Sequence, residues 1–177
     1  MNDWSENFAL SRQVGVSFRT VKPKDMPFLE ELYRSTRWEE VASTGWPEDM
    51  RIQFLKQQFA AQHAHFEQHY SDAKKWVLLR GKEQIGRLYL EEWPSQFRIV
   101  DIALMPSSRG SGLGTVLLQD IKNLAFAREK SVSIHVEKAN RAKDLYLREG
   151  FVTIEDKGVY DLMDCPPQSA DQLITTS

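Results

Sequence analysis

Cysteine is nearly absent from this sequence, because Cys165 is the only one among 177 residues. A lone thiol excludes an internal disulfide framework and a paired-cysteine zinc site, and it suits a reducing compartment, so a cytoplasmic location is expected. Long apolar runs are also missing: none approaches the roughly 18 residues that a membrane span requires. The formal net charge is only −2, which argues against a nucleic-acid partner bound through its phosphates.

The composition is that of an ordinary globular protein, with 41% hydrophobic and 27% charged residues. The length predicts one domain that is large enough for a substantial core. Residues 1–13 lack the basic start and apolar segment of a signal peptide and are expected to form a flexible leader. We expect the domain to span 14–165, followed by a polar, mobile tail over 166–177.

Hydrophobic periodicity predicts an alternation of strands and helices. The expected elements are a strand at 14–21, helices at 25–35 and 49–70, strands at 74–80, 84–92 and 97–105, a helix at 113–127, a strand at 131–135, a helix at 140–150, and strands at 152–155 and 159–163. Residues 36–49 read as a connector between the first two helices. This order predicts an α/β (α+β) fold, a mixed sheet with helices on both of its faces.

One stretch carries a recognisable binding motif. The apolar strand at 97–105 is broken at Pro106 and is followed by Arg109-Gly110-Ser111-Gly112-Leu113-Gly114, directly before a helix. Glycine lets a backbone approach a ligand closely, and the first amides of a helix have no partner within it. These amides also carry the positive end of the helix dipole, so the turn is suited to bind phosphate.

The glycine spacing separates this motif from related phosphate-binding loops. It is neither the G-x-G-x-x-G of dinucleotide-binding domains nor the G-K-[ST] ending of a P-loop, since Thr115 follows Gly114 directly. The pattern R-x-x-G-x-G resembles the pyrophosphate loop of the GNAT family of acetyl-CoA-dependent N-acetyltransferases. A second stretch strengthens the resemblance, because Asn140, the Leu145-Tyr146 pair and the Gly150-Phe151 ending fit that family's N-x-x-A-x-x-L-Y-x-x-x-G-F pattern.

The resemblance is specific over residues 97–151, although the alanine of the second pattern is shifted: Lys143 stands at its usual place and Ala142 comes before it. It implies a splayed mixed sheet of about seven strands, with the cofactor arm lying between strands. It also implies that acetyl-CoA is the cosubstrate and that no metal is needed. The cofactor-binding residues implied are Ile102, Ala103, Leu104, Arg109, Gly110, Ser111, Gly112, Leu113, Gly114, Thr115 and Asn140. For Asn140, a purely helix-capping role stays open.

The implied activity is direct transfer of the acetyl group to a primary amine in a ternary complex. Tyr146 matches the family's general-acid tyrosine, whose phenol is protonated at neutral pH, although a core aromatic role stays open. A backbone N–H near Leu104 is expected to stabilise the oxyanion. Histone-type members place a glutamate eleven residues before the loop, but Arg98 stands there and cannot act as a base. The nearby carboxylates, each of which could instead be a surface charge, are Glu91, Glu92 and Asp101.

The acceptor is the least determined part of the prediction. Acidic residues gather in the first two helices and their connector and favour a cationic amine, unless they only solvate helix ends. These residues are Glu30, Glu31, Glu39, Glu40, Glu48 and Asp49. Trp38 and Trp46 either cover the core or line an acceptor pocket. Many relatives form dimers, so a homodimer is possible.

Two alternatives to the enzyme hypothesis follow from the same residues. A non-catalytic acyl-CoA-binding sensor or regulatory module would keep the glycine loop without turnover. An NAD(P)-binding domain fits poorly, because it requires a different glycine spacing and an acidic residue at the end of the next strand. His65 and His69 stand four residues apart but lack the glutamate of an H-E-x-x-H zinc motif, so no metal site is predicted.

Overall fold

The structure, a computed structural model, describes residues 3–168, so most of the tail expected at 166–177 lies outside the described residues. The helices are η1 (Trp4–Asn7), α1 (Ala9–Gln13), η2 (Pro23–Asp25), α2 (Met26–Ala42), α3 (Glu48–His69), η3 (Pro106–Ser108), α4 (Leu113–Ala127) and α5 (Ala142–Arg148). The strands are β1 (Val16–Thr20), β2 (Lys74–Arg80), β3 (Glu83–Glu92), β4 (Gln96–Leu104), β5 (Ser131–Glu137), β6 (Val152–Asp156) and β7 (Tyr160–Cys165). No helix within 3–168 is long and apolar enough to cross a membrane.

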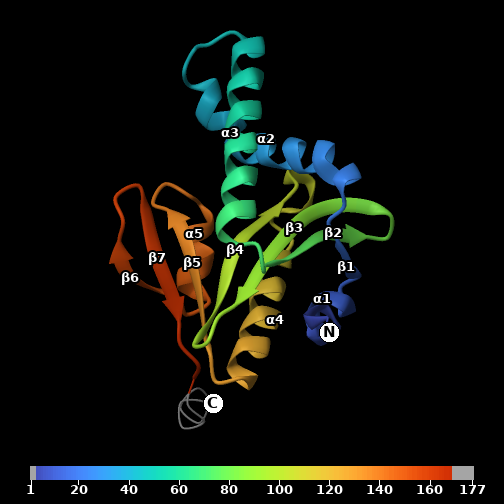
Figure 1. Cartoon of the computed structure of the whole chain (residues 1–177), viewed down its shortest axis with the longest axis vertical. Helices are drawn as coiled ribbons and strands as arrows, with labels where there is room; N and C mark the ends of the chain where they lie inside the picture. Colours follow the sequence, from blue (N-terminus) through green and yellow to red (C-terminus); the bar gives the residue numbers. More distant parts are fainter. Residues whose placement is uncertain (1–2, 169–177) are drawn as a thin grey trace.

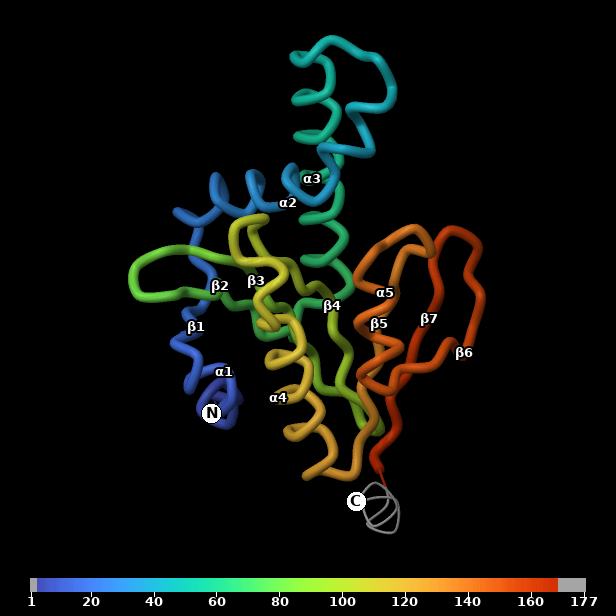
Figure 2. Tube along the Cα trace, turned by 180° about the vertical axis from the view of Figure 1, so that it is seen from behind, coloured from blue at the N-terminus to red at the C-terminus, as the bar shows by residue number. Residues whose placement is uncertain are grey.

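The seven strands form one mixed sheet in the order β1-β2-β3-β4-β5-β7-β6. Only β4 and β5 run parallel, and α4 connects them, because parallel neighbours require a crossover. Helix α3 crosses one face of the sheet, whereas α4 and α5 cover the other (Figures 1 and 2). The predicted mixed sheet with helices on both faces is confirmed.

Strands β4 and β5 separate halfway along their length. Their pairing ends at Ile99 and Ile134, although β4 continues to Leu104 and β5 to Glu137. On its other side β4 stays paired with β3, and there the register shifts: Tyr89 faces Asp101, but Leu90 faces Ile99. The extra residue, Val100, is a β-bulge, which bends and twists a strand. The bulge coincides with the place where β4 leaves β5, and this splay matches the groove that the sequence predicted.

The main core lies between the sheet and α4. Alternate residues of the central strands point to this side, as expected from the period of two in a strand, and pack on one stripe of α4. Core residues on the strands are Leu88, Leu90, Phe97, Ile99, Val132 and Ile134, and those on α4 are Leu113, Leu117, Leu118, Ile121, Leu124 and Ala125. This packing fixes the start of α4 relative to the end of β4.

The N-terminal residues differ from the flexible leader that the sequence suggested. Trp4 and Phe8 are buried in the main core, and Trp4 packs edge-on against Trp76 and Phe97. The buried carboxylate of Asp120 on α4 accepts hydrogen bonds from the N–H groups of Leu10 and Ser11, at 3.1 and 2.7 Å, and from the Ser11 hydroxyl. The domain therefore includes residues 3–13, and α4 holds them in place.

Helix α2 crosses α3, and the first half of α3 projects beyond the sheet together with the loop that joins the two helices (Figure 1). Helix α2 continues to Ala42, so the connector is shorter than the predicted 36–49 and Trp38 lies within a helix. The Arg51 guanidinium stacks over the Trp38 ring at 4.9 Å, and Trp46 packs edge-on against Phe54 at 5.4 Å. Both tryptophans thus pack against residues of α3 rather than on the main core.

Candidate active site

The turn between β4 and α4 presents a run of free backbone donors. Within residues 3–168, the N–H groups of 110–115 donate to no acceptor, and the first hydrogen bond of α4 runs from Val116 to the carbonyl of Gly112 at 3.1 Å. Gly110 and Gly112 have φ values of 74° and 81°, a left-handed conformation that other residues adopt only with strain. The turn thereby gathers successive N–H groups at the positive end of the α4 dipole, as an anion site requires.

Gly114 has a different structural role from Gly110 and Gly112. Its φ is not positive, and a Cβ built there would lie 3.0 Å from Cδ2 of Leu145. Leu145 belongs to α5 and packs against the main core. The third glycine therefore lets α5 approach the first turn of α4.

The N–H groups of 110–115 are called the cradle below. The edge of β4 beside this cradle lacks a neighbouring strand. Ile102, Ala103 and Leu104 pair with Leu88, Arg87 and Gly86 of β3, but not with β5. Their other edge faces the splay, where an extended ligand could add to the sheet. Sequence reasoning placed the cofactor arm on these residues, and the register leaves the necessary edge free of strand pairing.

Arg109 lies between this edge and α2. Its Nε donates to the Leu104 carbonyl at 2.9 Å, and its Nη2 lies 3.4 Å from the Ser35 hydroxyl. Burial lowers the pKa of Arg109, but a guanidinium stays charged at neutral pH. The predicted cation therefore stands at the entrance of the loop, with its planar group against the strand edge.

Asn140 caps the short helix α5. Its side-chain oxygen accepts a hydrogen bond from the Ala142 N–H at 2.9 Å, and its carbonyl accepts one from Lys143. The side chain is exposed. This is the capping role that the sequence left open, and the side-chain NH₂ remains available for a ligand.

Tyr146 is the most deeply placed of the predicted site residues. It is 4% exposed, belongs to the main core and packs edge-on against Phe151. Burial, with a smaller contribution from the negative charge of Asp101, raises the pKa of its phenol above the usual value. The hydroxyl makes no hydrogen bond to any of residues 3–168. The phenol therefore stays protonated at neutral pH, and its O–H group donates to no acceptor within these residues.

Only one of the three carboxylates considered as a base lies at the splay. Glu92 bonds to Arg128 and Lys130 at the far end of β3, each at 2.7 Å, and Glu91 accepts from the Trp93 indole at 2.7 Å. Asp101 follows the bulge directly and forms an ion pair with the buried Arg87. Asp101 is therefore the carboxylate placed nearest to the expected chemistry.

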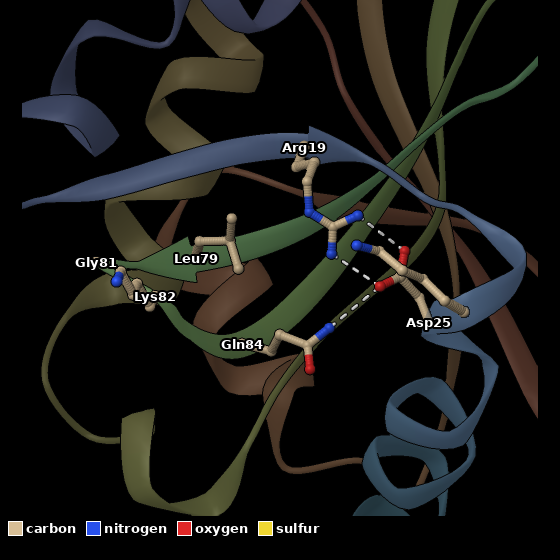
Figure 3. A pocket seen from close by; sticks show the side chains of 7 residues that line it. Arg19, Asp25, Leu79, Gly81, Lys82 and Gln84 are labelled. Atoms are coloured by element: carbon tan, nitrogen blue, oxygen red, sulfur yellow. Dashed lines mark hydrogen bonds and ion pairs between the residues drawn. The ribbon is translucent and has the colours of Figure 1, made fainter.

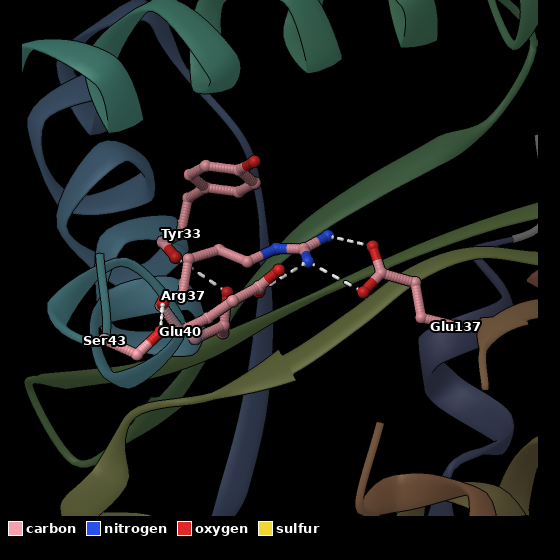
Figure 4. A network of polar contacts seen from close by, with 6 residues as sticks. Tyr33, Arg37, Glu40, Ser43 and Glu137 are labelled. Carbon is pink, nitrogen blue, oxygen red and sulfur yellow. Dashed lines mark hydrogen bonds and ion pairs between the residues drawn. The ribbon is translucent and has the colours of Figure 1, made fainter. Parts of the chain in front are cut away.

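An ion pair spans the open end of the splay, and sequence reasoning missed it. Arg37 of α2 bonds through both terminal nitrogens to Glu137, the last residue of β5, and also to Glu40 at 3.1 Å. Figure 4 shows the guanidinium reaching from α2 across to Glu137, with Tyr33 beside it. Hydrogen bonds from Arg37 lower the pKa of Glu137. Helical periodicity gave no signal for this pair, since its members are 100 positions apart.

The acidic residues expected around the acceptor site have different surroundings. Glu40 contacts Arg37, and Glu39 lies 3.4 Å from Arg141. Glu48 and Asp49 occupy the first turn of α3, where a negative charge is favourable in itself. Glu39 and Glu40 thus face arginines, whereas Glu48 and Asp49 are charges at a helix end.

A separate surface pocket lies between β1, η2 and the β2–β3 hairpin. Figure 3 shows Arg19 holding the buried Asp25 from two nitrogens, at 2.8 and 3.0 Å, with Gln84 at 3.3 Å from the same carboxylate. Arg19 lowers the pKa of Asp25. None of the residues predicted to bind the cofactor lines this pocket. Within 3–168, no group of three or more His, Cys, Asp or Glu side chains is arranged to hold a metal ion.

Residues 39–164 match the family model described as an acetyltransferase (GNAT) domain. No curated protein sequence matches the chain significantly. Many solved structures share the fold. The PaiA N-acetyltransferase of Thermoplasma acidophilum, solved in complex with coenzyme A, has 16% identity and a TM-score of 0.63, over 85% of this chain and 98% of that one.

Two further structures are similar. The ribosomal-protein-S18-alanine N-acetyltransferase of Escherichia coli has 16% identity and a TM-score of 0.57, over 88% of this chain and 96% of that one. A GNAT family acetyltransferase of Elizabethkingia anophelis, solved with acetyl-CoA bound, has 14% identity and a TM-score of 0.54, over 86% and 98%. At these identities the likeness establishes the fold.

Proposed function

Because the chain belongs to the GNAT family of acetyltransferases, we propose that it transfers the acetyl group of acetyl-CoA directly to a primary amine, with both substrates bound together. The observation that carries this proposal is the juxtaposition of the cradle, the N–H groups of 110–115, with the unpaired edge of β4. The cradle is suited to bind a diphosphate, and the strand edge is suited to pair with an extended amide chain. Coenzyme A contains both groups. Relatives of the same fold bind coenzyme A or acetyl-CoA, which supports the assignment.

In this proposal each part of the cofactor has its own residues. The N–H groups of 110–115 bind the pyrophosphate, and the pantetheine arm adds along Ile102, Ala103 and Leu104 as an extra strand. The side-chain NH₂ of Asn140 donates to the arm. The thioester then lies in the splay between β4 and β5, where the bulge at Val100 has separated the strands.

The chemical step forms a C–N bond and breaks the C–S bond of the thioester. The neutral amine attacks the carbonyl carbon, and a backbone N–H of β4 near Leu104 stabilises the oxyanion. As the intermediate collapses, the sulfur leaves and Tyr146 donates its proton to the thiolate, while the proton that the nitrogen loses on becoming an amide returns to the phenolate, so no net proton is gained or lost. Burial raises the pKa of the phenol, so Tyr146 holds its proton throughout the physiological range but is a weaker acid than a free tyrosine.

The amine must lose a proton before it attacks. An alkylamine with a pKa of about 10.4 is only roughly one part in two thousand neutral at pH 7, a cost of about 4–5 kcal/mol. Asp101 is the carboxylate positioned to receive this proton, directly or through water, with Arg87 fixing its orientation. The acidic residues of α2 and α3 favour a cationic amine, either a small molecule or part of a peptide. A chain with one cysteine agrees with a cytoplasmic enzyme.

An acceptor panel assayed for release of free CoA tests the proposal. Diamines, amino acids, short peptides with free amino termini and arylamines, each with acetyl-CoA, should include at least one acceptor with turnover well above background hydrolysis. Calorimetry with acetyl-CoA alone provides the parallel measurement of binding. Tight binding without turnover across the panel would favour the alternative, a non-catalytic acyl-CoA sensor, and absence of binding would refute both.

A further inference from the structure

A second buried arginine lies on the α3 face of the sheet, one residue before β4 leaves β5. Arg98 is 5% exposed, and its guanidinium stacks over the Trp93 ring at 4.5 Å. Its Nε donates to the Ser133 hydroxyl at 2.8 Å, and its Nη1 lies 3.1 Å from Nδ1 of His135. Because a guanidinium only donates, Nδ1 accepts this bond. The side chain is thus fixed from three directions by neutral groups.

No carboxylate forms an ion pair with Arg98 within residues 3–168. Glu91 faces it across the β3–β4 ladder, but its Oε2 accepts from the Trp93 indole, and it forms no ion pair with Arg98. Burial, and then the charge of Arg98, lower the pKa of His135, so this ring is neutral at pH 7. Glu91 therefore compensates the buried charge of Arg98 only from a distance, and an anion in direct contact would lower the remaining cost of burial.

The contrast with Arg87 shows that this arrangement is specific to one position. Arg87 is similarly buried, at 3% exposed, on the neighbouring strand and the same face. It forms an ion pair with Asp101 and a hydrogen bond to Gln62 at 2.6 Å, so its charge is compensated inside the protein. Arg98 is similarly buried beside the sheet and an aromatic ring, but the carboxylate opposite it, that of Glu91, forms no ion pair with it.

The third nitrogen of the Arg98 guanidinium, Nη2, is not completely enclosed. Nη2 makes no hydrogen bond to any of residues 3–168. Among the side-chain nitrogens and oxygens of these residues, only Arg51 Nε is both fully enclosed and without a hydrogen-bond partner, so Arg98 Nη2 is not fully enclosed. Nη2 therefore keeps some contact with solvent. His135 beside it is exposed, so a small anion can approach along β5.

We propose that Arg98 binds a carboxylate of the acceptor, so that the substrates are primary amines that also bear a carboxylate, as amino acids do. The inference rests on the proposed function for the reacting amine. The cradle occupies the α4 side of the splay, so the acceptor approaches from the face that carries Arg98 and Asp101. A carboxylate on Arg98 would orient the amine toward the bulge of β4, beside the thioester.

Matched acceptor pairs test this inference in the unmodified enzyme. We compare δ-aminovalerate with its primary amide, and L-lysine with L-lysinamide, by kcat/KM for CoA release. The carboxylate member should be favoured by roughly tenfold to a hundredfold, because a hydrogen-bonded ion pair is lost in the amide. Equal rates on both members of each pair would overturn the proposal without any variant.

Variants then assign the preference to this side chain. In Arg98→Gln the preference for the carboxylate should fall to about one while turnover of the amide persists, and Arg98→Lys should recover part of it. Arg80→Gln, an exposed position at the end of β2, is the matched control and should keep the full preference. A preference that survives in Arg98→Gln would place the carboxylate elsewhere.

A binding measurement separates this inference from the proposed function. The guanidinium stacks on Trp93, so titration with δ-aminovalerate alone should change the tryptophan fluorescence, and Trp93→Phe should remove that change. If no amine releases CoA but this titration saturates and depends on Arg98, the proposed function fails and the carboxylate site stands. Turnover of amines without carboxylate preference or a fluorescence change would overturn only the carboxylate site.

Discussion

A Cβ added at Gly86 would lie 2.3 Å from the backbone oxygen of Ala103. The two residues belong to adjacent strands, and Gly86 pairs with Leu104 at the end of the β3–β4 ladder. Glycine here lets β3 approach the segment of β4 whose opposite edge faces the splay. The geometry of the proposed pantetheine edge therefore depends on a glycine outside the recognised motifs.

Replacing Gly86 with alanine should displace Ala103 and weaken binding of acetyl-CoA. Overpacking against backbone costs about 1–3 kcal/mol, because a carbonyl in a ladder cannot rotate away. Gly114→Ala is the control for stability alone, because Gly114 belongs to the proposed cofactor turn: it also has no positive φ, and its Cβ meets only the flexible end of Leu145 at 3.0 Å. Thermal unfolding should show the larger loss for Gly86→Ala, and calorimetry should show that Gly86→Ala weakens acetyl-CoA binding. A larger loss of stability for Gly114→Ala, or unchanged binding in Gly86→Ala, would contradict this explanation.

Gly112→Asp should abolish measurable binding of acetyl-CoA. The backbone at Gly112 is left-handed, with φ 81°, so any side chain there is strained. Aspartate also adds a negative charge where the diphosphate would lie. Gly158→Asp imposes a similar backbone strain, at φ 87°, in the β6–β7 turn. Both variants should lose about 1–2 kcal/mol of stability, but only Gly112→Asp should lose the cofactor. Equal affinities in calorimetry would place the cofactor elsewhere.

Tyr146→Phe should lower kcat by roughly a hundredfold with little change in the affinity for acetyl-CoA. Stability should hardly change, because the hydroxyl has no hydrogen-bond partner within residues 3–168. The raised pKa of the phenol means that its proton is retained as pH rises, so loss of the general acid should produce no basic limb below about pH 10. A basic limb near neutrality that disappears in Tyr146→Phe would show that the pKa of the phenol is lowered instead of raised.

Asp101→Asn should lower both stability and activity. Removing the charge leaves Arg87 buried without its counter-ion, which costs about 3 kcal/mol, and it also removes the proposed base. Glu92→Gln breaks the ion pairs with Arg128 and Lys130 away from the splay, so it should affect stability alone. Urea unfolding and kcat distinguish the two effects. Full activity in folded Asp101→Asn would assign deprotonation of the amine to water.

The Arg37–Glu137 pair should make stability depend on pH at the acidic end. Arg37 lowers the pKa of Glu137 in the folded state, so the stabilisation is present above the unfolded pKa of about 4.3 and is lost as pH falls through the folded pKa. In Glu137→Gln this contribution, about 1 kcal/mol for a partly buried pair, should be missing at pH 7 and the acid dependence weaker. Thermal unfolding from pH 7 to pH 3 measures it, with exposed Glu129→Gln as the control. An unchanged acid dependence in Glu137→Gln would show that the pair contributes nothing.

The sequence predicted the elements that repeat a local pattern. Strands β2 to β4, the helices α3 and α4 and the glycine turn between β4 and α4 lie within a few residues of their expected positions. Helix α2 was predicted too short, because Arg37 and the residues around it lack an apolar stripe and are held by contacts with α3 and β5. The N-terminal residues were read as loose because their anchor, Asp120, is more than 100 positions away.

The sequence by itself determined the glycine turn, its position between a strand and a helix, and the resemblance to an acetyltransferase family. These are local properties, since left-handed glycines and unpaired helix amides require only neighbouring residues. The tertiary structure alone decided where β4 leaves β5 and which charges on the α3 face are compensated. It paired Arg87 with Asp101 and left Arg98 without an ion-pair partner in direct contact, because strand register determines which distant side chains meet.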